Sequence, residues 1–160
     1  MASRFADSIA QAVKHKKAVE HTQEAFRAWQ NCNWSHIEFL TAGGFVDCDL
    51  TMQDNSGCNM LHYACRVVTE VNHQAIKYLI ANAPDLACQY SFATGAPKSW
   101  IPLHALCDAP FNKALEPVEF YQLQAAMIDD LFSVMDLSTI LSPILSGMTA
   151  FRVSVPQCNQ

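Results

Sequence analysis

The stretch Gly57-Cys58-Asn59-Met60-Leu61-His62-Tyr63-Ala64-Cys65 combines a turn residue with a short apolar segment that contains a Leu-His pair. It is followed at 75–83 by Ala-Ile-Lys-Tyr-Leu-Ile-Ala-Asn-Ala, whose apolar residues have the spacing of one helix face. A second Leu-His pair lies in Trp100-Ile101-Pro102-Leu103-His104-Ala105-Leu106-Cys107. A turn, a short helix and an amphipathic second helix in this order are typical of helical repeat proteins.

These paired segments resemble ankyrin repeats, over about residues 34–152 and best at 53–88 and 99–107. The resemblance implies an all-α fold: a short ankyrin-like α-solenoid of about three helix-turn-helix repeats with extended loop tips, preceded by N-terminal capping helices. It also implies that the chain acts by binding a protein, because such repeats present recognition surfaces rather than catalytic machinery.

The sequence divides into an N-terminal helical cap at 1–33 and ankyrin-like repeats at 34–160. Within the repeats we expect a partial unit at 34–52, two longer units at 53–89 and 90–136, and a partial or capping unit at 137–160. In this last unit, Gly147-Met148-Thr149-Ala150-Phe151 is similar to the opening of a further repeat.

Apolar spacing, glycine and proline predict the helices at the two ends of the chain. Apolar residues at steps of three and four over 3–30 predict one long helix or two short ones. A helix from about Trp34 ends at Gly43-Gly44, because glycine just past an apolar helix is a common stop. Pro117 opens a long apolar helix that reaches Met135, since proline is tolerated in a first helical turn.

The spacing within the central units departs from the standard repeat. We expect helices to start near Met60 and near Ala75, which makes the link at 66–73 about three residues longer than usual. The segments 90–100 and 108–117 are expanded as well. Loops held by a rigid scaffold commonly carry recognition, so we expect specificity in these expanded segments.

Composition limits the classes of function. The chain has 160 residues with a net charge of −5, and only 16% of its residues are charged while 51% are hydrophobic. A nucleic-acid partner calls for a basic face, and the one basic cluster, at 14–17, predicts a solvated helix face instead. No apolar run is long enough for membrane insertion. The seven cysteines are odd in number and form no Cys-x-x-Cys, which favours an intracellular, reducing compartment: the cytoplasm first, with the nucleus or a host cytosol as alternatives.

Two His-x-x-Cys pairs, His62 with Cys65 and His104 with Cys107, place an imidazole and a thiol one helical turn apart. Zinc uses such ligands, so a zinc-binding or thiol-dependent protein stays open as an alternative. The resemblance implies a structural histidine and a packed small residue at these positions. Because motifs for nucleophilic catalysis and phosphate binding are absent, we expect no enzyme and assign no catalytic, cofactor-binding or metal-ligating residue.

In ankyrin repeats, partners contact the loop tips and the exposed side of each first helix. Carried over by position, this predicts partner contacts at Asn55, Ser56, Cys58, Tyr63, Arg66, Lys98, Ser99, Trp100, Ala105 and Asp108. Tyrosine, arginine and tryptophan are the residue types that dominate interface energies. For Trp100 the alternative is that its ring is tucked against the enlarged loop.

We therefore expect a non-catalytic interaction module, a scaffold, adaptor or effector, with a protein partner that the sequence does not identify. The high apolar content favours an alternative in which the chain is a constitutive subunit of a larger assembly.

Overall fold

The computed structural model describes residues 2–91 and 100–141, and side chains from residue 6 onward. Over these ranges the fold is all-α, as expected, and holds no strand. Its elements are α1 (Ala2–Gln30), α2 (Trp34–Ala42), α3 (Met60–Ala64), α4 (Glu70–Asn82), the 3-10 helix η1 (Pro84–Cys88), α5 (Pro102–Cys107), α6 (Pro117–Phe132) and α7 (Leu137–Ile140).

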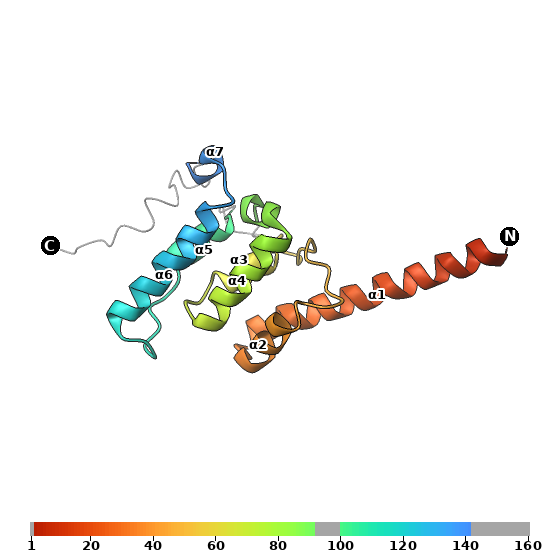
Figure 1. The fold of residues 1–160 in the computed structure, drawn as a ribbon, viewed down its shortest axis with the longest axis horizontal. Helices are drawn as coiled ribbons and strands as arrows, with labels where there is room; N and C mark the ends of the chain where they lie inside the picture. Colours follow the sequence, from red (N-terminus) through yellow and green to blue (C-terminus); the bar gives the residue numbers. More distant parts are fainter. Residues whose placement is uncertain (1, 92–99, 142–160) are drawn as a thin grey trace.

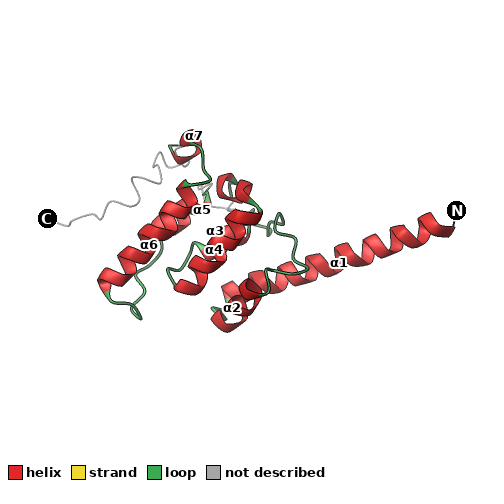
Figure 2. Cartoon of the chain, in the orientation of Figure 1, coloured by secondary structure: helices red, strands yellow, loops and turns green. Residues whose placement is uncertain are grey.

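The helices form two rows, and Figures 1 and 2 show α4 and α6 of the second row lying side by side. In one row α1 contacts α3, and α3 contacts the short helix α5. In the other row α2 contacts α4, and α4 contacts α6. Each short helix also packs against the longer helix that follows it. The chain is therefore a stack of helix pairs, and the C-terminal end of α1 with α2 takes the place of the first pair.

The core runs between the two rows. Its largest fully buried side chains are Ile37, Met60, Leu61, His62, Ile76, Leu79, Leu86, Ile101, Leu103, Leu106, Met127 and Leu131. Every helix from α2 to α6 contributes to this set. Burying one large aliphatic side chain stabilises a fold by about 1.5–3 kcal/mol, so burial shared in this way joins the layers to one another.

Proline and glycine mark helix ends as expected. Pro102 and Pro117 stand in the first turns of α5 and α6. At the end of α2, Gly43 is the C-cap and Gly44 has φ +69°, a left-handed conformation that glycine adopts without strain. Helix α6 ends at Phe132, earlier than the predicted Met135, although Met135 is still buried.

Helix α4 corrects the sequence prediction, because it starts at Glu70 rather than near Ala75. The side chain of Thr69 caps it by accepting from the Asn72 backbone N–H at 3.1 Å. Asn72 is buried, where Trp29 Nε1 donates to its Oδ1 at 3.1 Å. The prediction placed the start too late because the first turn of α4 contains polar residues that resemble a loop. The link between α3 and α4 is therefore shorter than expected.

The N-terminal helix is a single element, and only its C-terminal part packs on the other helices. Phe26 and Trp29 are buried, whereas every residue from 6 to 17 is exposed. We call residues 6–17 of α1 the arm. Figure 1 shows it projecting away from the rest of the molecule. Within the segment 1–33 that we expected to form a cap, only the C-terminal end of α1 is buried.

In the part of the chain that the structure describes, no helix combines the length and the apolar character needed to cross a membrane. The unit expected at 137–160 begins with α7, and the repeat opening at 147–151 lies outside the described residues.

Because the arm is exposed, removal of residues 1–17 should change the free energy of unfolding by less than about 0.5 kcal/mol. Phe26→Ala, at the buried end of the same helix, should lower it by about 3–5 kcal/mol. Urea unfolding of dilute protein measures both. An equal loss for the two changes would show that the arm belongs to the packed fold.

Candidate functional site: a groove between α3 and α5

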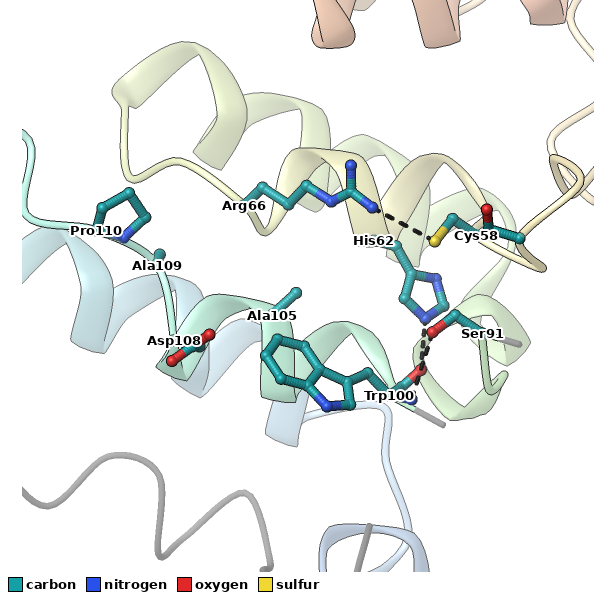
Figure 3. Close-up of a pocket in the computed structure, with 10 residues that line it drawn as sticks. Cys58, His62, Arg66, Ser91, Trp100, Ala105, Asp108, Ala109 and Pro110 are labelled. Atoms are coloured by element: carbon teal, nitrogen blue, oxygen red, sulfur yellow. Dashed lines mark hydrogen bonds between the residues drawn. The ribbon is translucent and has the colours of Figure 1, made fainter. Parts of the chain in front are cut away.

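A groove with a volume of about 500 Å³ lies between the first helices of the two central pairs, beside the loops that precede them. Figure 3 shows Arg66 and Cys58 on one side of it and Trp100, Ala105 and Asp108 on the other. Its lining residues are Ser56, Cys58, His62, Arg66, Ser91, Trp100, Ala105, Asp108, Ala109 and Pro110. Two walls of different character enclose it.

The loop tip on the first wall is held in shape by Asp54. Its Oδ1 accepts from the backbone N–H groups of Ser56 at 2.8 Å and Cys58 at 2.9 Å. The backbone N–H of Asp54 donates to the Cys58 carbonyl, and the Asp54 carbonyl accepts from the backbone N–H of Gly57, each at 2.9 Å. Gly57 has φ +72°. A short carboxylate that bonds backbone two residues on is a standard means of fixing a turn. The tip therefore presents Ser56 to the groove from a fixed backbone.

The helix side of the same wall is built on Tyr63. Its hydroxyl donates to Asp54 Oδ2 at 2.6 Å and accepts from Gln30 Nε2 at 2.9 Å, and its ring packs on Phe26 at 5.2 Å. The guanidinium of Arg66 lies 4.4 Å from the centre of the Tyr63 ring, a cation–π arrangement. Arg66 Nη2 also donates to Cys58 Sγ at 3.5 Å. Arg66 is thus held over the groove although it is exposed.

His62 joins this wall to the opposite one. Its Nε2 lies 2.8 Å from the backbone carbonyl oxygen of Trp100, which only accepts. Its Nδ1 lies near both an acceptor, Asn59 Oδ1 at 2.9 Å, and a donor, the Asn59 backbone N–H, so the proton is assigned to Nε2. The backbone N–H of Asn59 donates to Nδ1 at 3.3 Å, and Asn59 Oδ1 caps α3 by accepting from the His62 backbone N–H at 3.0 Å. The His62 ring therefore bonds both to the residue that caps α3 and to the loop that leads to α5.

The second wall carries Trp100, which is half-buried, followed by Ala105 and Asp108 along α5. Two hydrogen bonds fix the backbone of Trp100, because its carbonyl accepts from His62 Nε2 and from the Ser91 backbone N–H, each at 2.8 Å. Its ring lies 6.4 Å from that of His104. Figure 3 shows the Trp100 ring beside Ala105 on the groove side of α5. The wall is mainly apolar, with one carboxylate at its far end.

The charge of the groove comes from two exposed groups, Arg66 on one wall and Asp108 on the other. Burial lowers the pKa of His62 from 6.5 to about 4, so its ring is neutral at pH 7. Burial also raises the pKa of the Cys58 thiol, which therefore stays protonated. The groove is thus apolar at its centre and carries opposite charges on its two sides.

The structure gathers six of the predicted contact residues in this groove: Ser56, Cys58, Arg66, Trp100, Ala105 and Asp108. Asn55 is exposed in the loop tip but does not line the groove. Lys98 and Ser99 lie outside the described residues.

Tyr63 corrects the expectation of an exposed contact. Only 4% of its surface is exposed, because its ring is covered by Phe26 and its hydroxyl bonds to Asp54. Tyr63 instead contributes to the groove indirectly, because the guanidinium of Arg66 stacks on its ring.

Sequence reasoning did not assign four of the lining residues to the site: His62, Ser91, Ala109 and Pro110. The last two belong to the expanded segment 108–117, which the spacing had marked as a place for specificity. Ser91 lies in the expanded segment 90–100, which was also expected to carry specificity, and the folded chain brings it next to Trp100.

The His-Cys pairs lie in packed surroundings. Cys65 is completely buried, and burial raises the pKa of its thiol far above the usual value. Both ring nitrogens of His62 are engaged in hydrogen bonds. Among residues 6–91 and 100–141, no three His, Cys, Asp or Glu side chains are placed to share a metal ion, and the cysteines there form no disulfide. His62, Cys65 and His104 are thus buried, and Cys107 is half-buried.

Comparisons of the chain with protein-family models, with curated proteins and with solved structures found no match.

The buried His62 makes stability depend on pH. Its pKa in the folded chain, about 4, is below the 6.5 of an exposed histidine, so the unfolded chain binds the proton first as the pH falls. The stability that the neutral His62 ring contributes is fully present above pH 6.5. It is lost as the pH falls from there to 4, which lowers the free energy of unfolding by an amount on the order of 3 kcal/mol. Urea unfolding at several pH values measures the loss.

The matched control is His21→Gln, at an exposed position of α1, which should keep the wild-type pH dependence. His62→Gln should unfold more easily at pH 7 but lose less between pH 6.5 and 5. Identical slopes for His62→Gln and wild type would contradict a buried neutral ring.

Proposed function

We propose that this protein is an ankyrin-like interaction module that binds a protein partner in the groove between α3 and α5, without chemistry of its own. The observation that carries the proposal is the groove itself: loop tip and first helices converge there, and six of its lining residues were selected from the sequence alone. In an ankyrin-like array these are the positions that face a partner.

Repeated helix pairs support the ankyrin-like assignment. The backbone N–H of Asn59 donates to His62 Nδ1, and the backbone N–H of Ile101 donates to His104 Nδ1, each at 3.3 Å. The two Leu-His segments thus fold in the same way. Each short helix leads through a loop to a longer one, and the helices of one pair contact the corresponding helices of the next pair.

The chemistry of the groove suits an extended peptide segment. Trp100 and Ala105 provide an apolar surface for one large side chain, and Arg66 and Asp108 provide opposite charges on either side of it. Tryptophan and arginine supply much of the binding energy at protein interfaces when a partner excludes water from them. The support of Arg66 by Tyr63 lowers the entropy cost of ordering the guanidinium on binding.

A second version of the function, a constitutive subunit of a larger assembly, is favoured by the apolar side chains exposed outside the groove. Phe39, Val46, Val118 and Tyr121 are among them. Apolar patches on a protein surface commonly mark contacts with other chains.

Trp100→Ala and Arg66→Ala should each weaken the complex with the partner by about 1–3 kcal/mol while leaving the melting temperature nearly unchanged. The partner is first isolated by pull-down with the folded chain, and affinities are then measured by calorimetry. The control is Lys77→Ala, an exposed basic residue on α4 that does not line the groove, which should bind like wild type.

Two results would contradict this function. If Trp100→Ala lowered stability strongly and left affinity unchanged, Trp100 would belong to the core. If Lys77→Ala weakened binding as much as Arg66→Ala, the partner would not be recognised in the groove.

A further inference from the structure

Helix α6 carries an apolar stripe on the side that faces away from α4. Val118, Tyr121, Ala125, Ile128 and Phe132 recur at steps of three and four, so they share one helix face. The exposed fractions are 67% for Val118 and 60% for Tyr121, and Ile128 and Phe132 are half-buried. The opposite side of the helix, with Phe120, Met127 and Leu131, is buried.

The surroundings of this stripe are acidic. Between 116 and 136 the chain has Glu116, Glu119, Asp129, Asp130 and Asp136 and no lysine or arginine. Asp130 Oδ2 lies 2.7 Å from His73 Nε2, and the other carboxylates are exposed. Two copies of α6 laid against each other would bring these charges together, which disfavours a symmetric contact. The stripe therefore calls for an apolar partner surface with basic flanks.

The arm of α1 has this character. Ile9 and Val13 lie one turn apart on one face with half of their surface exposed, and the small residues Ala6 and Ala10 beside them allow close approach of another helix. Lys14, Lys16 and Lys17 follow directly. Lys16 forms an ion pair with Glu20 at 3.9 Å, and both groups are largely exposed. Such a weak pair is readily exchanged for another.

The arm and the stripe match in length but lie apart in the molecule. The arm measures roughly 18 Å and α6 about 24 Å, at 1.5 Å per residue. Figure 1 shows the arm pointing away from the body on the side opposite α6. A copy therefore cannot place its own arm on its own stripe.

We propose that the arm of one copy docks on the α6 stripe of a second copy, so that the chain associates head to tail. Apolar contacts join Ile9 and Val13 to the stripe, and the lysines of the arm lie next to the carboxylates around α6. A head-to-tail contact uses two different surfaces, so it continues into a ring or an open row of copies. The contact leaves the groove between α3 and α5 accessible, and it does not depend on the proposed function.

The test uses the full chain and measures mass by light scattering during size exclusion, over a concentration series at low and at high salt. Wild type should form dimers and larger species as concentration rises, and less so at high salt, because the paired charges are exposed. An arm variant, with Lys14→Glu, Lys16→Glu and Lys17→Glu, and a stripe variant, with Val118→Asp and Tyr121→Asp, should each raise Kd at least about tenfold.

Mixing the two variants is the decisive measurement. The stripe variant keeps its arm and the arm variant keeps its stripe, so a one-to-one mixture should form a heterodimer and nothing larger. Val46→Asp, an exposed apolar position away from both surfaces, is the control and should associate like wild type. Circular dichroism checks that all variants are folded.

Three outcomes would overturn the proposal. Wild type that stays monomeric at its highest soluble concentration would exclude the contact. An arm variant that still dimerises while the stripe variant does not would assign the stripe to a symmetric contact. A stripe variant that loses stability without a change in mass would show that the stripe is covered within one chain.

Discussion

The rest of the structure depends on the hydrogen bonds that the buried side chain of His62 makes to Asn59 and to Trp100. Its Nδ1 accepts from the backbone N–H of Asn59, the residue whose side chain caps α3, and its Nε2 donates to the carbonyl of Trp100 in the loop that leads to α5. A buried polar group costs free energy unless it is hydrogen-bonded, so the ring holds both partners in place. The hydrogen bond from His62 to the Trp100 carbonyl sets the distance between the two walls of the groove. His104 repeats the local arrangement one layer on, and within the described residues its Nε2 has no hydrogen-bond partner.

The two rows of helices give the molecule two different surfaces. The short helices and loop tips form a groove whose backbone is fixed by hydrogen bonds and whose charges are few and opposed. The long helices form the other row, in which α6 presents a larger apolar stripe with acidic flanks. The first surface suits selective recognition of a peptide segment, because its polar groups are preorganised. The second suits association between copies, because its partner surface is present on α1.

Much of the helix order could be predicted from the sequence, because proline and Leu-His segments act locally. Pro102 and Pro117 begin helices, and Gly44 follows the end of one, as expected. The start of α4 could not be predicted, since the buried Asn72 looks like a loop residue until Trp29 and Val67 are seen to bond to it. Tyr63 is buried by a residue from α1, far away in sequence. Whether the arm packs or projects is also decided by tertiary contacts, which an apolar period does not encode.

The most direct test of this structure is the position of the proton on the ring of His62. Nitrogen-15 NMR of histidine-labelled protein distinguishes a proton on Nε2 from one on Nδ1. Because Nε2 donates to the Trp100 carbonyl and Nδ1 accepts from Asn59, the proton should be on Nε2, and the ring should stay neutral from pH 7.5 to about 5. A proton on Nδ1, or a ring that titrates near pH 6.5, would contradict the bond that joins the two layers and shapes the groove.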